Sequence, residues 1–421
     1  MVKLKLLFAL FYCLIILFLL PACKDYVLDI EDPNNVVNDI QLNNENQVPF
    51  LINGVKAQFS LALDQILICA EGLSDALEYA SQLNAATFES FDRIDKGDLG
   101  APYDNTSIDQ AYNPLGEARF VADDLLRRTR IIKFSDQKIK NHSLFTAYLY
   151  SGITRYLYAT YFGLNADEGG GVINAGPFIP SQAMYDSAVV KFEKALNYTD
   201  FNYQDDTVFN DAGYARRILN SLIARCYLYQ GSYTAASDYL VQGMQPGDTP
   251  FQSLYFIGDD SDNYFWQQAG ANRTQFIVAQ RYEDYIHRDS LESSRIKIAE
   301  VSDFISFYDT LYYQTAYPEQ DSPITHISWQ ENHLMRAEII LRGQDTGDAL
   351  ALINEVRASH GLTGLTTVNL DTVLYQERDK ELFLTGARLP DQRRFNRWHL
   401  PAGTWRYLSI PRRERNANPN L

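Results

Sequence analysis

Two stretches of the chain place aromatic side chains among asparagine and arginine, a combination suited to recognising a sugar. Apolar ring faces stack on aromatic side chains, while amide, carboxylate and guanidinium groups hydrogen-bond the hydroxyl rim. The stretches span residues 79–105 and 255–285. A position in the core is the alternative interpretation of each aromatic residue, Trp266 included. The candidate ligand contacts are Asn84, Phe88, Phe91, Arg93, Tyr264, Trp266, Asn272 and Arg273.

The other chemistry-bearing residues form no catalytic or metal-binding motif. None of the six histidines stands in an H-E-x-x-H frame, and no G-x-S-x-G elbow or Walker loop occurs. The four cysteines form no C-x-x-C pair, and Asp259, Asp260 and Asp262 lack the rest of a calcium loop. The sequence therefore predicts a binding protein without a metal site or cofactor, not an enzyme, and leaves open whether a structural metal supports the inserted lobe. A glycosidase is an alternative, because folding alone brings two carboxylates together.

The charge balance excludes further classes of partner. With 37 Lys and Arg against 53 Asp and Glu, the net charge is −16, which disfavours nucleic acid and anionic lipid surfaces. Hydrophobic residues make up 46% and charged residues 21% of the chain, as in folded globular proteins. The 28 tyrosines and 23 phenylalanines are numerous, and packing between helices accounts for part of them.

The N-terminus has the pattern of a secretory signal. Two lysines precede an uncharged apolar run at 6–20, and Leu20-Pro21-Ala22-Cys23 resembles a bacterial lipid-attachment site. The run is short for a membrane-spanning helix, which needs about 20 residues. We expect removal of residues 1–22, acylation of Cys23, and a polar tether over 23–45. A plain signal peptide or an N-terminal anchor helix is the alternative.

Beyond the tether, apolar residues recur at three and four, which predicts helices almost throughout. Small residues such as Ala224, Gly231 and Ala236 lie where paired helices of a tetratricopeptide unit touch. The expected fold is mainly α, a tetratricopeptide-like superhelix with an inserted irregular lobe carrying minor β structure. We expect short strands near 276–284 and 305–315. The repeat helices are predicted at about 47–80, 113–130, 144–197, 215–243 and 330–359, and the lobe at 81–112 and 245–327.

Charged residues near the C-terminus have a structural interpretation. Glu377, Arg378, Glu381 and Arg388 are predicted to share one helix and to form ion pairs along or between helices. An arginine cluster follows, interpreted as a solvated face that neutralises acidic neighbours or, alternatively, as a contact to an acidic partner. Its members are Arg393, Arg394, Arg397, Arg412, Arg413 and Arg415. For Cys69 and Cys226 we favour two separate buried thiols and leave a disulfide open.

Several sequence blocks in the C-terminal third follow one another in a characteristic order. Residues 349–357 match an A-x-x-x-I-N-x-V-R run, and residues 377–388 match E-R-x-x-E-L-x-x-E-G-x-R with Thr385 replacing an acid. An Asp-x-Arg-Arg-aromatic block follows at 391–395, and an I-P … N-P-N ending at 410–420. Together with residues 23–29 after the signal, these blocks resemble the SusD/RagB family of Bacteroidota surface lipoproteins.

The resemblance implies a function in nutrient uptake. It implies a single SusD-like domain at 46–421, with the family block at 371–421, anchored by lipid to the cell-surface side of the outer membrane. Such a protein would bind an oligosaccharide, or a peptide, and deliver it to a SusC-like TonB-dependent transporter. The alternative is a tetratricopeptide-type interaction scaffold of the cell envelope without a small ligand. An exposed aromatic platform favours ligand capture, whereas a filled lobe favours the scaffold.

Overall fold

The computed structural model describes residues 39–258, 262–271, 273–301 and 310–421. The chain divides into two compact units, Met1–Asn44 and Glu45–Leu421. Of the first unit, the structure describes residues 39–44, which include the short helix η1 (Asp39–Leu42). The predicted signal, Cys23, residues 23–38 of the tether and Asn272 lie outside the described residues. Within the described part, no helix has both the length and the apolar character needed to cross a membrane.

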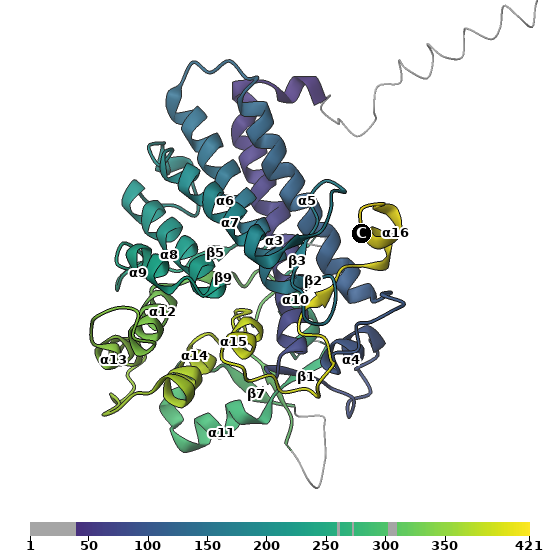
Figure 1. Cartoon of the computed structure of the whole chain (residues 1–421), viewed down its shortest axis with the longest axis vertical. Helices are drawn as coiled ribbons and strands as arrows, with labels where there is room; N and C mark the ends of the chain where they lie inside the picture. Colours follow the sequence, from purple (N-terminus) through teal and green to yellow (C-terminus); the bar gives the residue numbers. More distant parts are fainter. Residues whose placement is uncertain (1–38, 259–261, 272, 302–309) are drawn as a thin grey trace, which may run out of the picture. The chain divides into compact units, whose positions relative to one another are not determined.

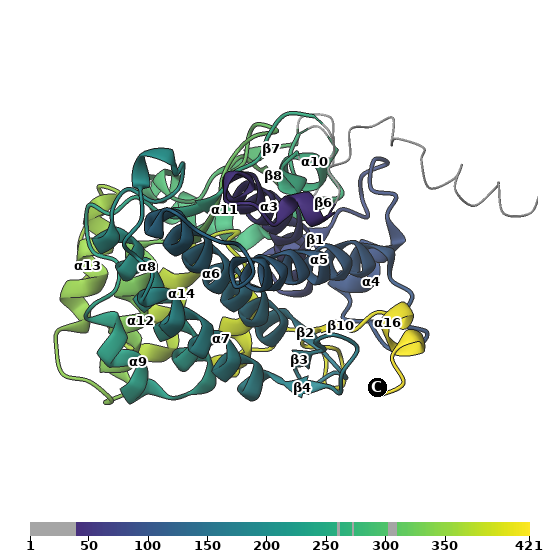
Figure 2. The same ribbon diagram turned by 90° about the horizontal axis from the view of Figure 1, so that it is seen from above.

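Helix pairs build the second unit, and the prediction of a mainly α repeat fold is confirmed. The two helices of each pair pack on each other, and α5 on α6 and α7 on α8 join successive pairs. Figure 1 shows the pairs following one another, and Figure 2 gives the view from above. The pairs are α3 (Val48–Leu73) with α5 (Thr106–Thr129), α6 (Gln137–Tyr161) with α7 (Ser181–Leu196), α8 (Ala212–Gln230) with α9 (Tyr233–Leu240), and α12 (Trp329–Leu341) with α13 (Ala349–Ser359).

Shorter helices connect and cover these pairs. Most of them are only a turn or two long. They are η2 (Glu45–Gln47), α4 (Glu89–Asp95), η3 (Tyr203–Asp205), α10 (Tyr264–Ala269), α11 (Gln280–Arg288), η4 (Ser290–Ser294), the π-helical turn η5 (Leu370–Leu374), α14 (Tyr375–Glu381), α15 (Arg388–Arg394) and α16 (Arg412–Ala417).

The strands of the described residues form two-stranded ribbons. Four ribbons are antiparallel and the ribbon of β2 with β10 is parallel. The ribbons are β1 (Leu77–Tyr79) with β6 (Phe276–Val278), β2 (Phe162–Gly163) with β10 (Leu408–Ser409), β3 (Gly170–Gly171) with β4 (Ile179–Pro180), β5 (Phe251–Ser253) with β9 (Ile324–Ile327), and β7 (Ile298–Glu300) with β8 (Tyr312–Gln314).

Two of the sequence-based helix boundaries were wrong by about seven residues. The helix expected to start at 113 begins at Thr106, because the Asn105 side chain accepts hydrogen bonds from the backbone N–H groups of Ser107 and Ile108. The helix expected to reach residue 80 ends at Leu73, and β1 follows it. The short strand expected near 276–284 is β6, which ends at Val278 before α11 begins at Gln280. Of the region 305–315, residues 305–309 are outside the described part, and β8 follows at Tyr312–Gln314.

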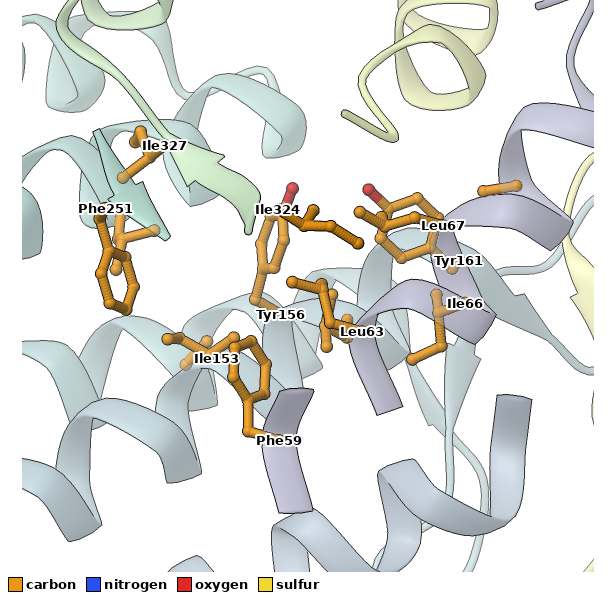
Figure 3. Packing of buried hydrophobic residues seen from close by; sticks show 14 of the residues in the cluster. Phe59, Leu63, Ile66, Leu67, Ile153, Tyr156, Tyr161, Phe251, Ile324 and Ile327 are labelled. Carbon is orange, nitrogen blue, oxygen red and sulfur yellow. The ribbon is translucent and has the colours of Figure 1, made fainter. Parts of the chain in front are cut away.

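The core joins the repeat helices to the ribbon of β5 and β9. Figure 3 shows Phe59 and Leu63 of α3 facing Ile153 and Tyr156 of α6, with Ile324 of β9 against them. All five side chains are buried. Burial of one such side chain is worth about 1.5–3 kcal/mol. The inserted segments are therefore anchored on the first helices of the repeat.

The charged C-terminal residues do form ion pairs, but not on one helix. Helix α14 ends at Glu381, and the chain turns through Leu384 (φ 57°) and Gly386 (φ 84°) before Arg388 opens α15. Left-handed backbone cannot continue a right-handed helix, so the shared helix of the prediction is broken here. The pairs instead connect elements. Arg378 donates to Asp391 at 2.6 and 3.0 Å.

The arginine cluster is not a simple solvated face. Arg393 donates to the carbonyls of Thr160 and Arg406, and Arg415 to those of Ile410 and Leu164. Arg394 pairs with Glu338 and Asp391. These arginines satisfy buried acceptors where the C-terminal segment crosses the repeat, which a linear count of charges does not show. Arg412 and Arg413 are exposed.

Candidate functional site

A hollow of about 490 Å³ opens between α4 and the start of α5. We call it the α4–α5 hollow. Hydrogen bonds hold its two walls together: Asn105 donates to the carbonyl of Ser90 at 2.8 Å, and the hydroxyls of Ser90 and Ser107 lie 2.7 Å apart. Hydroxyl and amide side chains make up most of the lining, with two carboxylates and one arginine among them. The hollow is lined by Thr87–Ser90, Arg93, Asp104–Ser107 and Gln110.

Phe88 is the aromatic side chain of this lining. The guanidinium of Arg273 lies 4.3 Å from the centroid of the Phe88 ring and donates to the Thr87 hydroxyl at 3.3 Å. Among the residues that the structure describes, Arg273 has no carboxylate partner. The fold therefore joins the two predicted stretches, 79–105 and 255–285, at the edge of one hollow.

The other sequence candidates differ in where the fold places them. Arg93 lines the hollow, and its guanidinium pairs with Asp104 at 3.3 Å and Asp98 at 3.8 Å. Tyr264 is half-buried nearby, with its hydroxyl 3.5 Å from the side-chain oxygen of Gln110. Phe91 lies in the core against Phe276, with ring centroids 4.7 Å apart, as the alternative interpretation of each aromatic expected.

Asn84 and Trp266 do not line the hollow. Asn84 is exposed, while Trp266 is half-buried in α10 and lies outside the buried apolar cluster. Trp266 is therefore not a core residue, in contrast to the alternative interpretation from the sequence. Its backbone N–H and that of Phe265 are bound by the Asn263 side chain, which caps α10.

Two buried polar residues that sequence reasoning missed position this site. The Gln275 side chain is fully buried; it accepts from the N–H groups of Thr87 and Phe88 at 2.8 and 3.0 Å and donates to the Ala85 carbonyl. Asp64, on the apolar face of α3, accepts from the N–H of Tyr264 at 2.9 Å. Burial without a cationic partner raises the pKa of Asp64 to about 8. The sequence could have indicated Asp64, because it is an acid among the apolar residues of a helix. No sequence pattern indicated Gln275.

The electrostatics of the hollow are mixed. Glu89 and Asp104 carry negative charge, while Arg93 and Arg273 carry positive charge. Within the described residues, no three His, Cys, Asp or Glu side chains come together to hold a metal ion. Neutral and polar ligands are therefore what this lining accommodates best.

No family model and no curated protein matches the chain. Solved structures do match. A SusD superfamily protein from Bacteroides thetaiotaomicron superposes with a TM-score of 0.71 at 16% identity, covering 90% of this chain and 98% of the other. The chain has the SusD superfamily fold. The resemblance read from the C-terminal blocks is thus confirmed at the level of the fold.

Two further SusD-like structures are described by their ligands. A laminarin-binding SusD-like protein has a TM-score of 0.68 at 15% identity, covering 90% of this chain and 99% of that one. Surface glycan-binding protein A of Bacteroides thetaiotaomicron, in complex with laminarihexaose, has a TM-score of 0.67 at 14% identity, with coverages of 90% and 98%. At such identities the likeness shows the fold and not the ligand.

Proposed function

We propose that the protein binds an oligosaccharide in the α4–α5 hollow and delivers it to a SusC-like TonB-dependent transporter. The observation that carries the proposal is the Phe88 ring at the hollow, backed by the Arg273 guanidinium at 4.3 Å. A ring held in this way can stack on the apolar face of a sugar, and the guanidinium edge can hydrogen-bond the hydroxyls. In this proposal the protein has no catalytic residues.

The lining supports a neutral, hydroxyl-rich ligand. Thr87, Ser90, Thr106 and Gln110 offer hydroxyl and amide groups at the surface of the hollow. Arg93 is already paired with two carboxylates, which leaves Arg273 as the guanidinium without an acidic partner among the described residues. A peptide is the second ligand class that such a lining would admit, and it belongs in the same binding panel.

The location and partner belong to the proposal as well. We propose that Cys23 carries the lipid, that the protein lies on the cell-surface face of the outer membrane, and that it covers the transporter. The names of the SusD-like neighbours, which include a surface glycan-binding protein, support a surface location. Co-purification of a large β-barrel protein with the native lipoprotein, lost when Cys23→Ala prevents anchoring, would test both statements.

The central experiment is calorimetry of the 24–421 fragment against a panel of oligosaccharides and peptides. We expect a saccharide to bind and Phe88→Ala to weaken it at least about tenfold, equivalent to about 1.4 kcal/mol. Phe50→Ala is the matched control, since Phe50 is 66% exposed at the start of α3 and does not line the hollow. Equal losses in both variants, or no saccharide binding at all, would contradict the proposal and favour the interaction scaffold.

A further inference from the structure

A stripe of exposed side chains runs along one face of α5. Thr106, Gln110, Asn113, Glu117 and Phe120 follow one another in steps of four and three residues, and all five are exposed. Residues so spaced lie on the same face of an α-helix. At 1.5 Å of rise per residue, the stripe is about 21 Å long. Its first two members line the α4–α5 hollow.

The last three members line a second hollow. It has a volume of about 440 Å³ and lies where α5, α16 and the loop around Asn174 meet. We call it the α5–α16 hollow; Figure 2 shows α16 beside α5. Phe120 is 60% exposed, unusually open for a phenylalanine. The side chain of Asn113 makes no hydrogen bond with any residue that the structure describes.

The rim of the second hollow is built from strained backbone. Asn174 and Ala175 both have left-handed φ angles, 53° and 52°; asparagine adopts this region readily, but it costs an alanine about 1–2 kcal/mol. The C-terminal asparagines hold this turn: Asn420 donates to the Ala175 carbonyl and Asn418 to the Gly176 carbonyl, both at 2.9 Å. The N-P-N ending of the chain thus fixes Asn174 at the rim. Strain retained in this way is typical of binding sites.

One carboxyl of α5 feels charged residues of both hollows. Asp109, on α5, has a buried Oδ1 that accepts no hydrogen bond from any described residue. The charges of Asp104, in the first hollow, and Arg413, in the second, both act on this carboxyl. Charged residues of both hollows thus act on the same part of α5, which links the two hollows along the helix.

We propose that the α5–α16 hollow is a second oligosaccharide-contacting site and that one glycan chain follows α5 from the first hollow to the second. Phe120 is its stacking platform, and Asn113, Asn174 and Arg413 are the hydrogen-bonding groups around it. The inference rests on the proposed function. It narrows the ligand class to an oligosaccharide long enough to span about 21 Å, so that a disaccharide would occupy the first hollow alone.

The test compares ligand lengths. Glycan arrays carrying laminarin and other neutral polysaccharides, each with its oligosaccharides down to the disaccharide, are probed with the unsubstituted protein, Phe120→Ala, Phe88→Ala and Phe50→Ala. We expect Phe120→Ala to weaken the longest member of the recognised series about tenfold and to leave the disaccharide unchanged. Phe88→Ala should weaken every length, and Phe50→Ala none. Asn113→Ala, exposed on the same stripe, should repeat the length dependence of Phe120→Ala.

The outcomes separate the two proposals. Suppose that binding depends on Phe88, but that Phe120→Ala and Asn113→Ala bind every ligand length as tightly as the unsubstituted protein does. This result overturns the second site and leaves the proposed function intact. No binding by the unsubstituted protein to any series overturns both. Amide hydrogen exchange measures contact with the second hollow directly. The longest ligand should slow exchange at residues 172–176, and the disaccharide should not.

Discussion

The carboxylate of Asp64 accepts a hydrogen bond from the backbone N–H of Tyr264 at 2.9 Å. The bond ties the interior of α3 to the first residue of α10, although 200 residues separate them in the sequence. Asp64 is 2% exposed and pairs with no cation among the described residues. The position of Tyr264 near the α4–α5 hollow thus depends on a buried acid.

Asp64 makes the stability of the protein depend on pH. Its folded-state pKa of about 8 lies above the ordinary value of 3.8, so the native state holds a proton that the unfolded chain releases between these values. Stability contributed by this group therefore falls as the pH rises from about 4 to 8. Asp64→Asn should remove up to about 1.4 kcal/mol per pH unit of that slope, measured by urea unfolding across the window.

Glu71 is the matched control for Asp64. Burial also raises the pKa of Glu71 to about 8, so the slope that remains in Asp64→Asn should decrease further in the double variant with Glu71→Gln. A slope unaffected by either substitution would contradict the assignment. Asp64→Asn should also leave saccharide binding nearly intact, because the amide oxygen can still accept from the Tyr264 N–H, whereas Asp64→Ala should weaken it.

Gly386 should tolerate no side chain. Its φ is 84°, and a Cβ there would lie 2.5 Å from the Tyr161 hydroxyl and closer still to Leu67. We expect Gly386→Ala to lower the free energy of unfolding by about 2–4 kcal/mol, from backbone strain and overpacking together. Gly231→Ala separates the two causes, since φ is 77° there and nothing lies within 4 Å. Gly231→Ala should lower the free energy of unfolding by about 1–2 kcal/mol. If Gly386→Ala lowered it by the same amount, packing around Gly386 would contribute nothing.

The buried pair of Arg378 and Asp391 should dominate the stability of the C-terminal block. Arg378 is fully buried, and its two bonds to Asp391 form a planar fork. Arg378→Met should lower the free energy of unfolding by about 3–5 kcal/mol, because Asp391 loses this partner in the interior. Arg412→Met, at an exposed position of α16, should change it by less than about 0.5 kcal/mol in the same denaturation assay. Comparable effects would argue against a structural role for the pair.

Cys69 and Cys226 should be inert in the folded protein. Cys69 and Cys226 are free and buried, and burial raises the pKa of both thiols well above the ordinary value. Since the thiolate is the reactive form, a thiol reagent should label the native 24–421 fragment only as fast as it opens. Urea should expose both at once. Rapid labelling of the native protein, or a mass that shows a disulfide, would contradict this.

Arg273 should act through the plane of its guanidinium. A lysine keeps the charge but cannot lie flat on the Phe88 ring, so Arg273→Lys should weaken saccharide binding nearly as much as Arg273→Ala. Calorimetry with the recognised saccharide measures this. Full binding by the lysine variant would show that charge alone is used.

The repeat helices were predictable because local rules determine them. Apolar residues at three and four, small residues at helix contacts and a glycine at the end of α8 act within a few turns of chain. Boundaries failed where a local cap was overlooked, as at Asn105. The C-terminal blocks likewise predicted the SusD fold, because their order along the chain is itself a sequence property.

The site depended on tertiary contacts. Phe88 and Arg273 could each be named as candidates from residue type, but their stacking required the ribbon of β1 and β6 and the buried Gln275 clamp. Phe91 and Phe88 lie three residues apart with the same chemistry, and only packing sent Phe91 to the core. Phe120 lay in a predicted repeat helix and became a candidate only when α16 and the strained Asn174 turn enclosed a hollow beside it. Sequence determines periodicity and local capping; which side chain meets a ligand depends on what distant segments leave uncovered.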